Sequence, residues 1–404
     1  MLIADSAVER LKRDLNFLPI RWVKFDIDQV QGCVTASCLW VRRSISMNVD
    51  NHQAMYAWGE GHDISSALGN DTSSAVQSVS PAAKGYREID TEMQALLQSY
   101  LQKYPATLAI VVSSLNDKTS DACTIRAEAY ATGVQADTRL LGWSMTKTIG
   151  AALIGIMIRQ GRMDIKEDCL LEEWKDDARA TITLGQLLQM NSGLRWSEDY
   201  FKISDVTRML YAESSVYDYA IARKLKHEPG THWSYSSGTS NILSGLLRQR
   251  IGDDIAYRKF AQRELFDPLG LDRAVLEMDR AGDLVLSSYG WATAREWTRF
   301  GELYLQGGSW GGREILTQDF VKWSQSAAQG SEGAYGAHIW LNSGQKAIPS
   351  VPADAFYENG FGSQRVLVIP SAGVVITVLS GMQMNFDYDG LYSGVLSHLS
   401  AGRS

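Results

Sequence analysis

The residues best suited to chemistry are a serine and a lysine one helical turn apart in an otherwise uncharged stretch. The segment from Gly142 to Arg159 contains Ser144 and Lys147, and Lys147 is the single charged residue between Ser144 and Arg159. Residues three positions apart share one face of a helix, so the hydroxyl and the amine should lie together. A helix N-terminus favours developing negative charge at the serine. Burial should lower the pKa of the lysine, which could then accept the serine proton.

The spacing S-x-x-K is weak evidence alone, because it is expected by chance in almost any chain of this length. A second copy, Ser343 to Lys346, lies in a polar, glycine-containing stretch, which predicts a turn with a solvated lysine. The first copy is followed by apolar residues at helical spacing, such as Ile149 and Leu153, and its opposite face is also uncharged. We therefore expect a helix that is buried on all sides, and we interpret the first serine and lysine as catalytic.

Composition indicates an ordinary globular protein. The 404 residues are 45% hydrophobic and 21% charged, which fits two or three domains or one large α/β domain with an insertion. A net charge of −7 and a pI near 5.5 leave no basic surface for nucleic acid. The four cysteines form no C-x-x-C pair and the six histidines are scattered, so we expect no metal and no cofactor. The composition does not specify an oligomeric state.

No segment is predicted to target or span a membrane. The residues from Met1 to Asn16 carry charges throughout and lack an apolar core. The longest uncharged apolar run, around Ile149 to Ile158, is too short to cross a bilayer. We expect a soluble protein, periplasmic if an export signal was removed and cytoplasmic otherwise.

The chain divides into an N-terminal extension and a main domain. Residues 1–85 are predicted to form loops and short strands, with strands at Cys33 to Val41 and Gln53 to Trp58. The stretch from Ala67 to Pro81 is rich in serine with glycine, asparagine and aspartate, and is typical of a loop or linker. The main domain covers residues 86–404.

Elements of the main domain alternate between helix and strand. The spacing predicts a helix over Glu88 to Tyr104, ended by Pro105, and then a hairpin of strands at Thr107 to Leu115 and Thr124 to Thr132. The β-branched run from Gly373 to Leu379 is typical of a central strand. Further helices are predicted at Thr181 to Met190, Ser204 to Lys226, Ser240 to Gln249, Trp291 to Gln306 and Leu391 to Leu399, and further strands at Tyr335 to Leu341 and Phe356 to Pro370.

Several motifs in order make the chain resemble the serine β-lactamase and penicillin-binding-protein superfamily. The similarity is to its branch of class C β-lactamases, esterases and nylon-oligomer hydrolases, and it spans about residues 86–404. The matching segments are Ser144 to Lys147, Ile182 to Leu194, Pro229 to Ser237, Leu265 to Leu271, Gly307 to Leu316 and Gly360 to Gln364. The resemblance implies an α/β (α+β) fold, with a central antiparallel sheet flanked by helices and a mainly helical subdomain inserted at about residues 165–290.

The resemblance also implies roles for particular residues. Ser144 would be the acylated nucleophile, and Lys147 and Tyr235 would share proton transfer to the leaving group. The backbone N–H groups of Ser144 and Phe361 would form the oxyanion hole. Substrate contacts are expected from the residues Ser237, Tyr200, Trp196, Asn359 and Gly360.

One departure from the family pattern bears on the substrate. The third motif, which usually begins with lysine or histidine, is not visible, and Glu358 and Asn359 precede Gly360 instead. A cation there would bind the carboxylate of a β-lactam or a peptide C-terminus. We therefore expect a serine hydrolase for a small ester or amide. A lactam substrate, in a β-lactamase or DD-peptidase, is the alternative within this family, and a non-catalytic ligand sensor or scaffold of the same fold is the alternative outside enzymes.

An α/β-hydrolase is the competing enzyme class. The residues Gly307 to Gly311 satisfy G-x-S-x-G, but a nucleophile elbow needs a strand before the serine and a helix after it. Here a predicted helix precedes the motif and Gly312 follows it, so we interpret the motif as a glycine-rich turn.

Overall fold

The computed structural model describes residues 89–115 and 123–401, together with the backbone of short strands at 24–28, 33–38, 41–46 and 86–87. The first three strands form an antiparallel sheet in the order β1 (Lys24–Asp28), β2 (Cys33–Cys38) and β3 (Val41–Ser46). The strand predicted at Cys33 to Val41 is therefore divided between β2 and β3. The predicted strand at Gln53 to Trp58 and the predicted loop at Ala67 to Pro81 lie outside the described residues.

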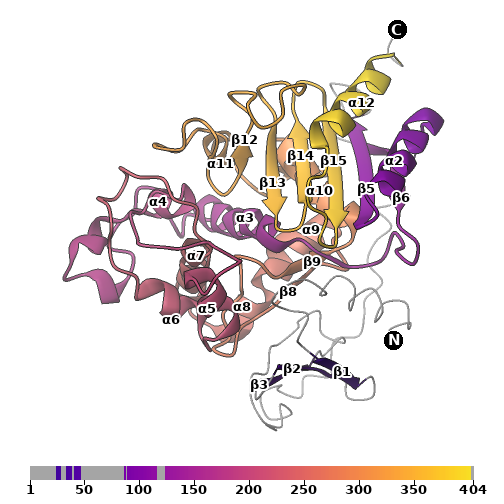
Figure 1. Cartoon of the computed structure of the whole chain (residues 1–404). Helices are drawn as coiled ribbons and strands as arrows, with labels where there is room; N and C mark the ends of the chain where they lie inside the picture. Colours follow the sequence, from indigo (N-terminus) through magenta and orange to yellow (C-terminus); the bar gives the residue numbers. More distant parts are fainter. Residues whose placement is uncertain are drawn as a thin grey trace.

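A seven-stranded sheet organises the main part of the chain (Figure 1). Its order is β12 (Trp340–Leu341), β13 (Phe356–Gly360), β14 (Gln364–Ile369), β15 (Val374–Ser380), β5 (Thr107–Leu115), β6 (Cys123–Tyr130) and β4 (Tyr86–Arg87). Neighbouring strands are antiparallel except for β4 and β6. The central antiparallel sheet is thus confirmed, and β15, which is buried along its whole length, lies in the middle as its sequence predicts.

Helices cover both faces of this sheet (Figure 1). The side chains of β14 alternate between the two, because successive residues of a strand point to opposite faces. Val366 and Val368 join the core under α3 (Thr146–Arg159) and α10 (Ala294–Leu305). Leu367 and Ile369 join the core under α2 (Thr91–Lys103) and α12 (Tyr388–Ala401). The sheet is therefore the middle layer of three.

The region between α3 and α10 has mostly helices as its regular secondary structure. Its helices are α4 (Leu184–Leu188), α5 (Asp205–Tyr211), α6 (Val216–Ile221), α7 (Ser237–Ile251), α8 (Asp254–Ala261) and α9 (Asp267–Leu269). A small sheet in the order β7 (Leu140–Leu141), β9 (Gly290–Ala292) and β8 (Val275–Leu276) joins the start of α3 to the end of this region. Figure 1 shows α3 running between the seven-stranded sheet and these helices.

The position of α3 confirms that it is buried on all sides. Every residue from Thr146 to Met157 is buried, including Lys147. Such a helix packs against apolar neighbours through its whole circumference, which explains why its sequence lacks a polar face. Within the part of the chain that the structure describes, no helix has the length and apolar character needed to cross a membrane.

Several predicted elements differ from the observed ones. The strand predicted at Phe356 to Pro370 is two strands, β13 and β14, because Gly362 and Ser363, with φ of 75° and 72°, turn the chain between them. Trp291 lies in β9, and α10 starts only after Thr293, which accepts a hydrogen bond from the Glu296 N–H in a capping box. The predicted helix over Ser204 to Lys226 is two short helices, because Ser204 caps α5 and Ser215 begins α6 with a cap of its own. These caps override the longer helical periodicity.

The predicted strand at Tyr335 to Leu341 is also mostly wrong, since only Trp340 and Leu341 form β12. His338 has a left-handed φ of 56°, which interrupts extended backbone. The competing G-x-S-x-G motif lies in a hairpin of β10 (Ser309–Trp310) and β11 (Arg313–Glu314) directly after α10. That geometry confirms a turn and excludes a nucleophile elbow.

Candidate active site

Ser144 lies in a short 3₁₀ turn, Trp143–Met145, that leads directly into α3. The turn is held from the side: Gly142 N–H donates to the Gly290 carbonyl at 2.9 Å, and the Gly290 N–H donates to the Thr146 hydroxyl at 2.8 Å. Trp143 has a left-handed φ of 49°, which is strained for a bulky residue. The chain therefore fixes a half-buried serine hydroxyl at the mouth of a buried helix.

Lys147 lies beneath this serine and is 1% exposed. Its Nζ is 3.0 Å from Ser144 Oγ, 3.0 Å from Ser237 Oγ and 2.7 Å from the Ser287 carbonyl oxygen. Burial lowers the pKa of Lys147 from 10.5 to about 8, and the negative charge of Glu198 opposes that shift. The amine is thus close enough to the serine to take its proton. With a pKa of about 8, part of the lysine is neutral near neutral pH and can accept that proton.

Tyr235 comes from the segment before α7 and lies beside the lysine, with Lys147 Nζ 4.9 Å from the centre of its ring. Its ring stacks on Trp340 at 5.5 Å and meets Tyr335 edge-on at 5.8 Å, which fixes its orientation. Burial raises the pKa of Tyr235 well above 10.0, while interaction with the Ser144 hydroxyl lowers it. The phenol is therefore held neutral, as a proton donor requires.

The end of β13 runs past the serine turn. The Cβ that Gly360 lacks would lie 2.2 Å from the Gly142 carbonyl oxygen, so only glycine allows this approach. Phe361 follows in the turn between β13 and β14, and its ring lies 5.7 Å from that of Trp143. The strand end thus brings the Phe361 backbone to the same turn as Ser144.

Aromatic side chains surround the serine turn. The Tyr200 ring stacks on Phe361 at 5.1 Å and meets Trp143 edge-on at 6.5 Å. Phe201, which is 65% exposed, lies 6.1 Å from Phe361. The Tyr200 hydroxyl is buried without a hydrogen-bond partner, and burial raises its pKa. Interactions with the Ser237 and Ser288 hydroxyls oppose this rise, so the Tyr200 hydroxyl lies near Ser237, the neighbour of Lys147.

Glu198 is a member of the site that sequence reasoning missed. Its Oε1 accepts the Ser237 hydroxyl at 2.5 Å, and its Oε2 accepts the Ser237 N–H at 2.9 Å and the Trp196 indole N–H at 2.5 Å. The structure therefore joins Trp196 and Ser237, both expected to contact substrate, through one carboxylate. The only signal in the sequence is an acidic residue between two aromatic ones, Trp196 and Tyr200.

Asn359 and Glu358, next to Gly360, point to opposite faces of β13. The Asn359 side-chain oxygen Oδ1 accepts two hydrogen bonds from Arg365, at 2.8 and 3.1 Å. Glu358 is 4% exposed, one of its oxygens has no hydrogen-bond partner, and burial raises its pKa well above 4.5. Glu358 is therefore a buried neutral carboxyl group, which supplies no cation for a substrate carboxylate.

Other titratable groups lie outside the chemistry. His338 is 2% exposed, and its ring nitrogens face the Leu188 carbonyl oxygen at 2.7 Å and the Ser240 hydroxyl at 2.9 Å. Burial lowers its pKa to about 3, so it stays neutral. The second S-x-x-K copy, Ser343 to Lys346, is an exposed turn.

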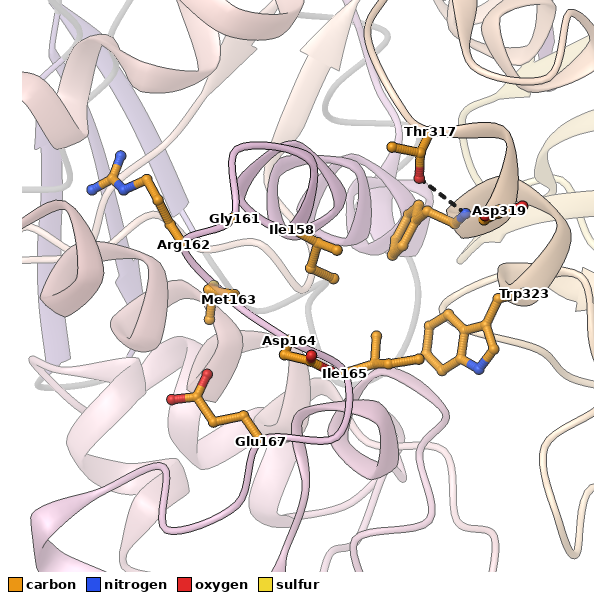
Figure 2. Close-up of a pocket in the computed structure, with 11 residues that line it drawn as sticks. Ile158, Gly161, Arg162, Met163, Asp164, Ile165, Glu167, Thr317, Asp319 and Trp323 are labelled. Atoms are coloured by element: carbon orange, nitrogen blue, oxygen red, sulfur yellow. Dashed lines mark hydrogen bonds between the residues drawn. The ribbon is translucent and has the colours of Figure 1, made fainter.

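A cavity of about 560 Å³ opens at the opposite end of α3 (Figure 2). It is lined by Ile158, Ile165, Phe320 and Trp323, among others. Ile158 is eleven residues beyond Lys147, which is roughly 16 Å along the helix axis. This cavity is therefore separate from the serine site. Across residues 89–115 and 123–401, no group of His, Cys, Asp and Glu side chains is arranged to hold a metal ion.

Comparison with known proteins places this geometry in a family. The chain is 24% identical over 336 residues to the 6-aminohexanoate-dimer hydrolase of Paenarthrobacter ureafaciens, covering 72% of this chain and 82% of that protein. A solved structure from Bacillus anthracis, named for the same hydrolase, superposes with a TM-score of 0.65 at 21% identity, over 79% of this chain and 88% of that one. A family VIII carboxylesterase superposes with a TM-score of 0.56 at 15% identity, over 77% and 99%.

The fold predicted from the sequence is thus confirmed by proteins of known structure. The family model described as Beta-lactamase matches residues 119–389, which include the serine turn, α3, the helical region and β13 to β15. This chain belongs to the Beta-lactamase family.

Proposed function

We propose that this protein is a serine hydrolase that cleaves a small ester or amide through a covalent acyl-enzyme. The observation that carries the proposal is the 3.0 Å distance between Lys147 Nζ and Ser144 Oγ, in a site where the lysine is buried and the serine is not. Relatives in sequence and structure are named as a 6-aminohexanoate-dimer hydrolase and a carboxylesterase, which act on an amide and an ester.

In the proposed first half-reaction, Ser144 Oγ attacks the substrate carbonyl carbon while its proton passes to neutral Lys147. The backbone N–H groups of Ser144 and Phe361 stabilise the oxyanion of the tetrahedral intermediate. Tyr235 then gives its proton to the leaving alcohol or amine as the bond to the carbonyl carbon breaks, and is reprotonated from Lys147. In the second half-reaction, water takes the place of the leaving group and attacks the acyl carbon, and the same proton transfers run in reverse. The acid and free Ser144 are then released.

The substrate class follows from the walls of the site. Tyr200, Trp143 and Phe361 form an aromatic surface beside Ser144, which suits an apolar acyl or alcohol group. In the sequence, Glu358 stands just before Gly360, in the segment where the resembling family usually has a cation that binds the carboxylate of a β-lactam or peptide. Tyr200 and Asn359 offer polar atoms to the substrate, and Gly360 allows close approach of its backbone. We therefore rank esters and simple amides above lactams.

A fluorophosphonate probe tests the enzyme against the alternative of a non-catalytic sensor. Labelling that disappears in Ser144→Ala supports the hydrolase, whereas an unlabelled protein supports the sensor. Rates on p-nitrophenyl butyrate, 6-aminohexanoate dimer and nitrocefin then rank the substrates. Faster turnover of the ester than of the cephalosporin is expected, and the reverse order would contradict the interpretation of Glu358.

A further inference from the structure

Lys147 can accept the Ser144 proton only if its hydrogen bonds to its other neighbours run in the right direction. A neutral amine has two N–H donors and one lone pair, and only the lone pair can accept the Ser144 proton. The Ser287 carbonyl oxygen, 2.7 Å away, can only accept, so it takes one N–H. The second N–H and the lone pair are left for two hydroxyls, Ser144 and Ser237, both at 3.0 Å. Which hydroxyl faces the lone pair decides whether Ser144 is activated.

Glu198 resolves this choice through Ser237. The Ser237 hydroxyl donates its single proton to Glu198 Oε1 at 2.5 Å, so toward Lys147 it can only accept. Lys147 must then direct its second N–H at Ser237 and its lone pair at Ser144. Resting on the hydrolase function proposed above, we propose that Glu198 is a positioning residue, which fixes Ser237 as an acceptor and so aims the lone pair of Lys147 at the nucleophile.

The carboxylate is held in the orientation that this role requires. Its other oxygen, Oε2, accepts the Trp196 indole N–H at 2.5 Å and the Ser237 N–H at 2.9 Å. Both groups are donors only, so they demand an acceptor at that position. Trp196 packs so tightly that a Cβ on Gly238 would lie 2.5 Å from its ring. Glu198 therefore cannot rotate away without leaving two N–H groups unpaired.

The charge of Glu198 gives the proposal a readout in pH. Its negative charge raises the pKa of Lys147 against the lowering by burial. The other titratable groups that face this cluster are His338, Tyr200, Tyr235 and Tyr335. His338 has a pKa of about 3 and burial raises the pKa of all three tyrosines, so these groups stay neutral between about pH 6 and about pH 9. Removing the Glu198 charge should therefore shift the titration of Lys147 to lower pH.

The variant Glu198→Gln tests this with almost no change in shape. The two N–H donors at the Oε2 position select the amide oxygen there, which turns the amide NH₂ toward Ser237 Oγ. The Ser237 proton must then point at Lys147 and occupy its lone pair. We expect kcat/KM for p-nitrophenyl butyrate to fall by about 10²-fold, with the acidic limb of its pH profile displaced to lower pH.

Two further variants separate positioning from packing. Because Glu198 acts through Ser237, Glu198→Gln should cost little more once Ser237→Ala is present, in a double-mutant cycle. Asp199→Asn is the matched control: this neighbouring carboxylate bonds to the Phe201 N–H and to Lys202, and should leave both rate and pH limb unchanged. Thermal unfolding of each variant checks that the fold is retained.

Three results would overturn the proposal. One is a Glu198→Gln enzyme with the rate and pH limb of the wild type. Another is a loss of kcat/KM in Glu198→Gln without displacement of the acidic limb of the pH profile. A loss of kcat/KM that is equally large in the Ser237→Ala background has the same meaning, since either result indicates packing alone. If the wild type neither turns over the ester nor reacts with fluorophosphonate, the hydrolase function fails and this inference with it, whereas an active wild type confines the failure to Glu198.

Discussion

The Cβ that Gly360 lacks would lie 2.2 Å from the carbonyl oxygen of Gly142, so the end of β13 and the turn that carries Ser144 are in backbone contact. Gly142 is itself fixed by its N–H bond to the Gly290 carbonyl at 2.9 Å. The distance between the Ser144 turn and the strand is therefore set by two glycines and not by flexible side chains. An oxyanion hole built from backbone N–H groups needs this kind of rigidity.

Gly360→Ala should therefore damage catalysis directly. The methyl group must push β13 away from the Ser144 turn and move the Phe361 N–H from the oxyanion. We expect kcat/KM for p-nitrophenyl butyrate to fall by about 10²-fold or more. Gly344→Ala is a suitable control, because a Cβ there meets only the Lys346 side chain at 3.8 Å or beyond. Equal activity of the two variants would contradict the proposed oxyanion hole.

The pH dependence of acylation should report Lys147. Below its pKa of about 8 the amine is protonated, donates all three N–H groups and cannot accept the Ser144 proton. The value of kcat/KM should therefore rise with pH through about 8 and fall about tenfold for each pH unit below that limb. The measurement is kcat/KM for an ester between about pH 6 and about pH 10. A profile that stays flat down to about pH 6 would exclude Lys147 as the base.

Tyr235→Phe should remove activity without unfolding the protein. The ring contacts with Trp340 and Tyr335 remain, while the proton donor for the leaving group is lost. We expect kcat to fall by about 10² to 10⁴-fold, with the larger loss on amides, because amine leaving groups depend more on protonation. Tyr304→Phe, which deletes a buried and unpartnered hydroxyl on α10, is the control and should keep full activity. Similar rates for Tyr235→Phe and the wild type would remove the phenol from the mechanism.

The parts of this site that the sequence predicts are the local ones. Ser144 and Lys147 are one helical turn apart, so their approach depends only on α3 forming, and the uncharged sequence of α3 indicates its burial. The strand Thr107–Leu115 has the predicted bounds, because its β-branched and aliphatic run suits a buried position in the sheet. Tyr235 could be assigned only through resemblance to a family, since its approach to Lys147 depends on how α7 packs.

Glu198 could not be predicted, for a physical reason. Its function lies in two hydrogen bonds to Ser237, 39 residues away along the chain, and neither periodicity nor composition encodes that pairing. The bounds of the helices that were predicted too long are wrong for another reason. Thr293 and Ser215 each begin a helix through an N-terminal cap, and a cap is a single-residue feature that a periodic pattern does not register.

The buried carboxyl group of Glu358 should make the folded protein less stable as pH rises. Its folded-state pKa lies well above 4.5, so this group's contribution is fully present below about pH 4.5 and is lost as pH rises toward the folded-state value. Over that window the unfolded chain binds one proton fewer at this site, which costs about 1.4 kcal/mol per pH unit. Glu358→Gln cannot ionise, so its Tm should exceed that of the wild type by a margin that grows between about pH 5 and about pH 8.

The buried Glu302, with a pKa of about 7, is common to both proteins and cancels from the comparison. Glu314→Gln, on the exposed β10–β11 hairpin, should show no such margin. A difference in Tm that does not change with pH would mean that Glu358 stays charged in the fold, and the site would then hold an anion where we infer a neutral group.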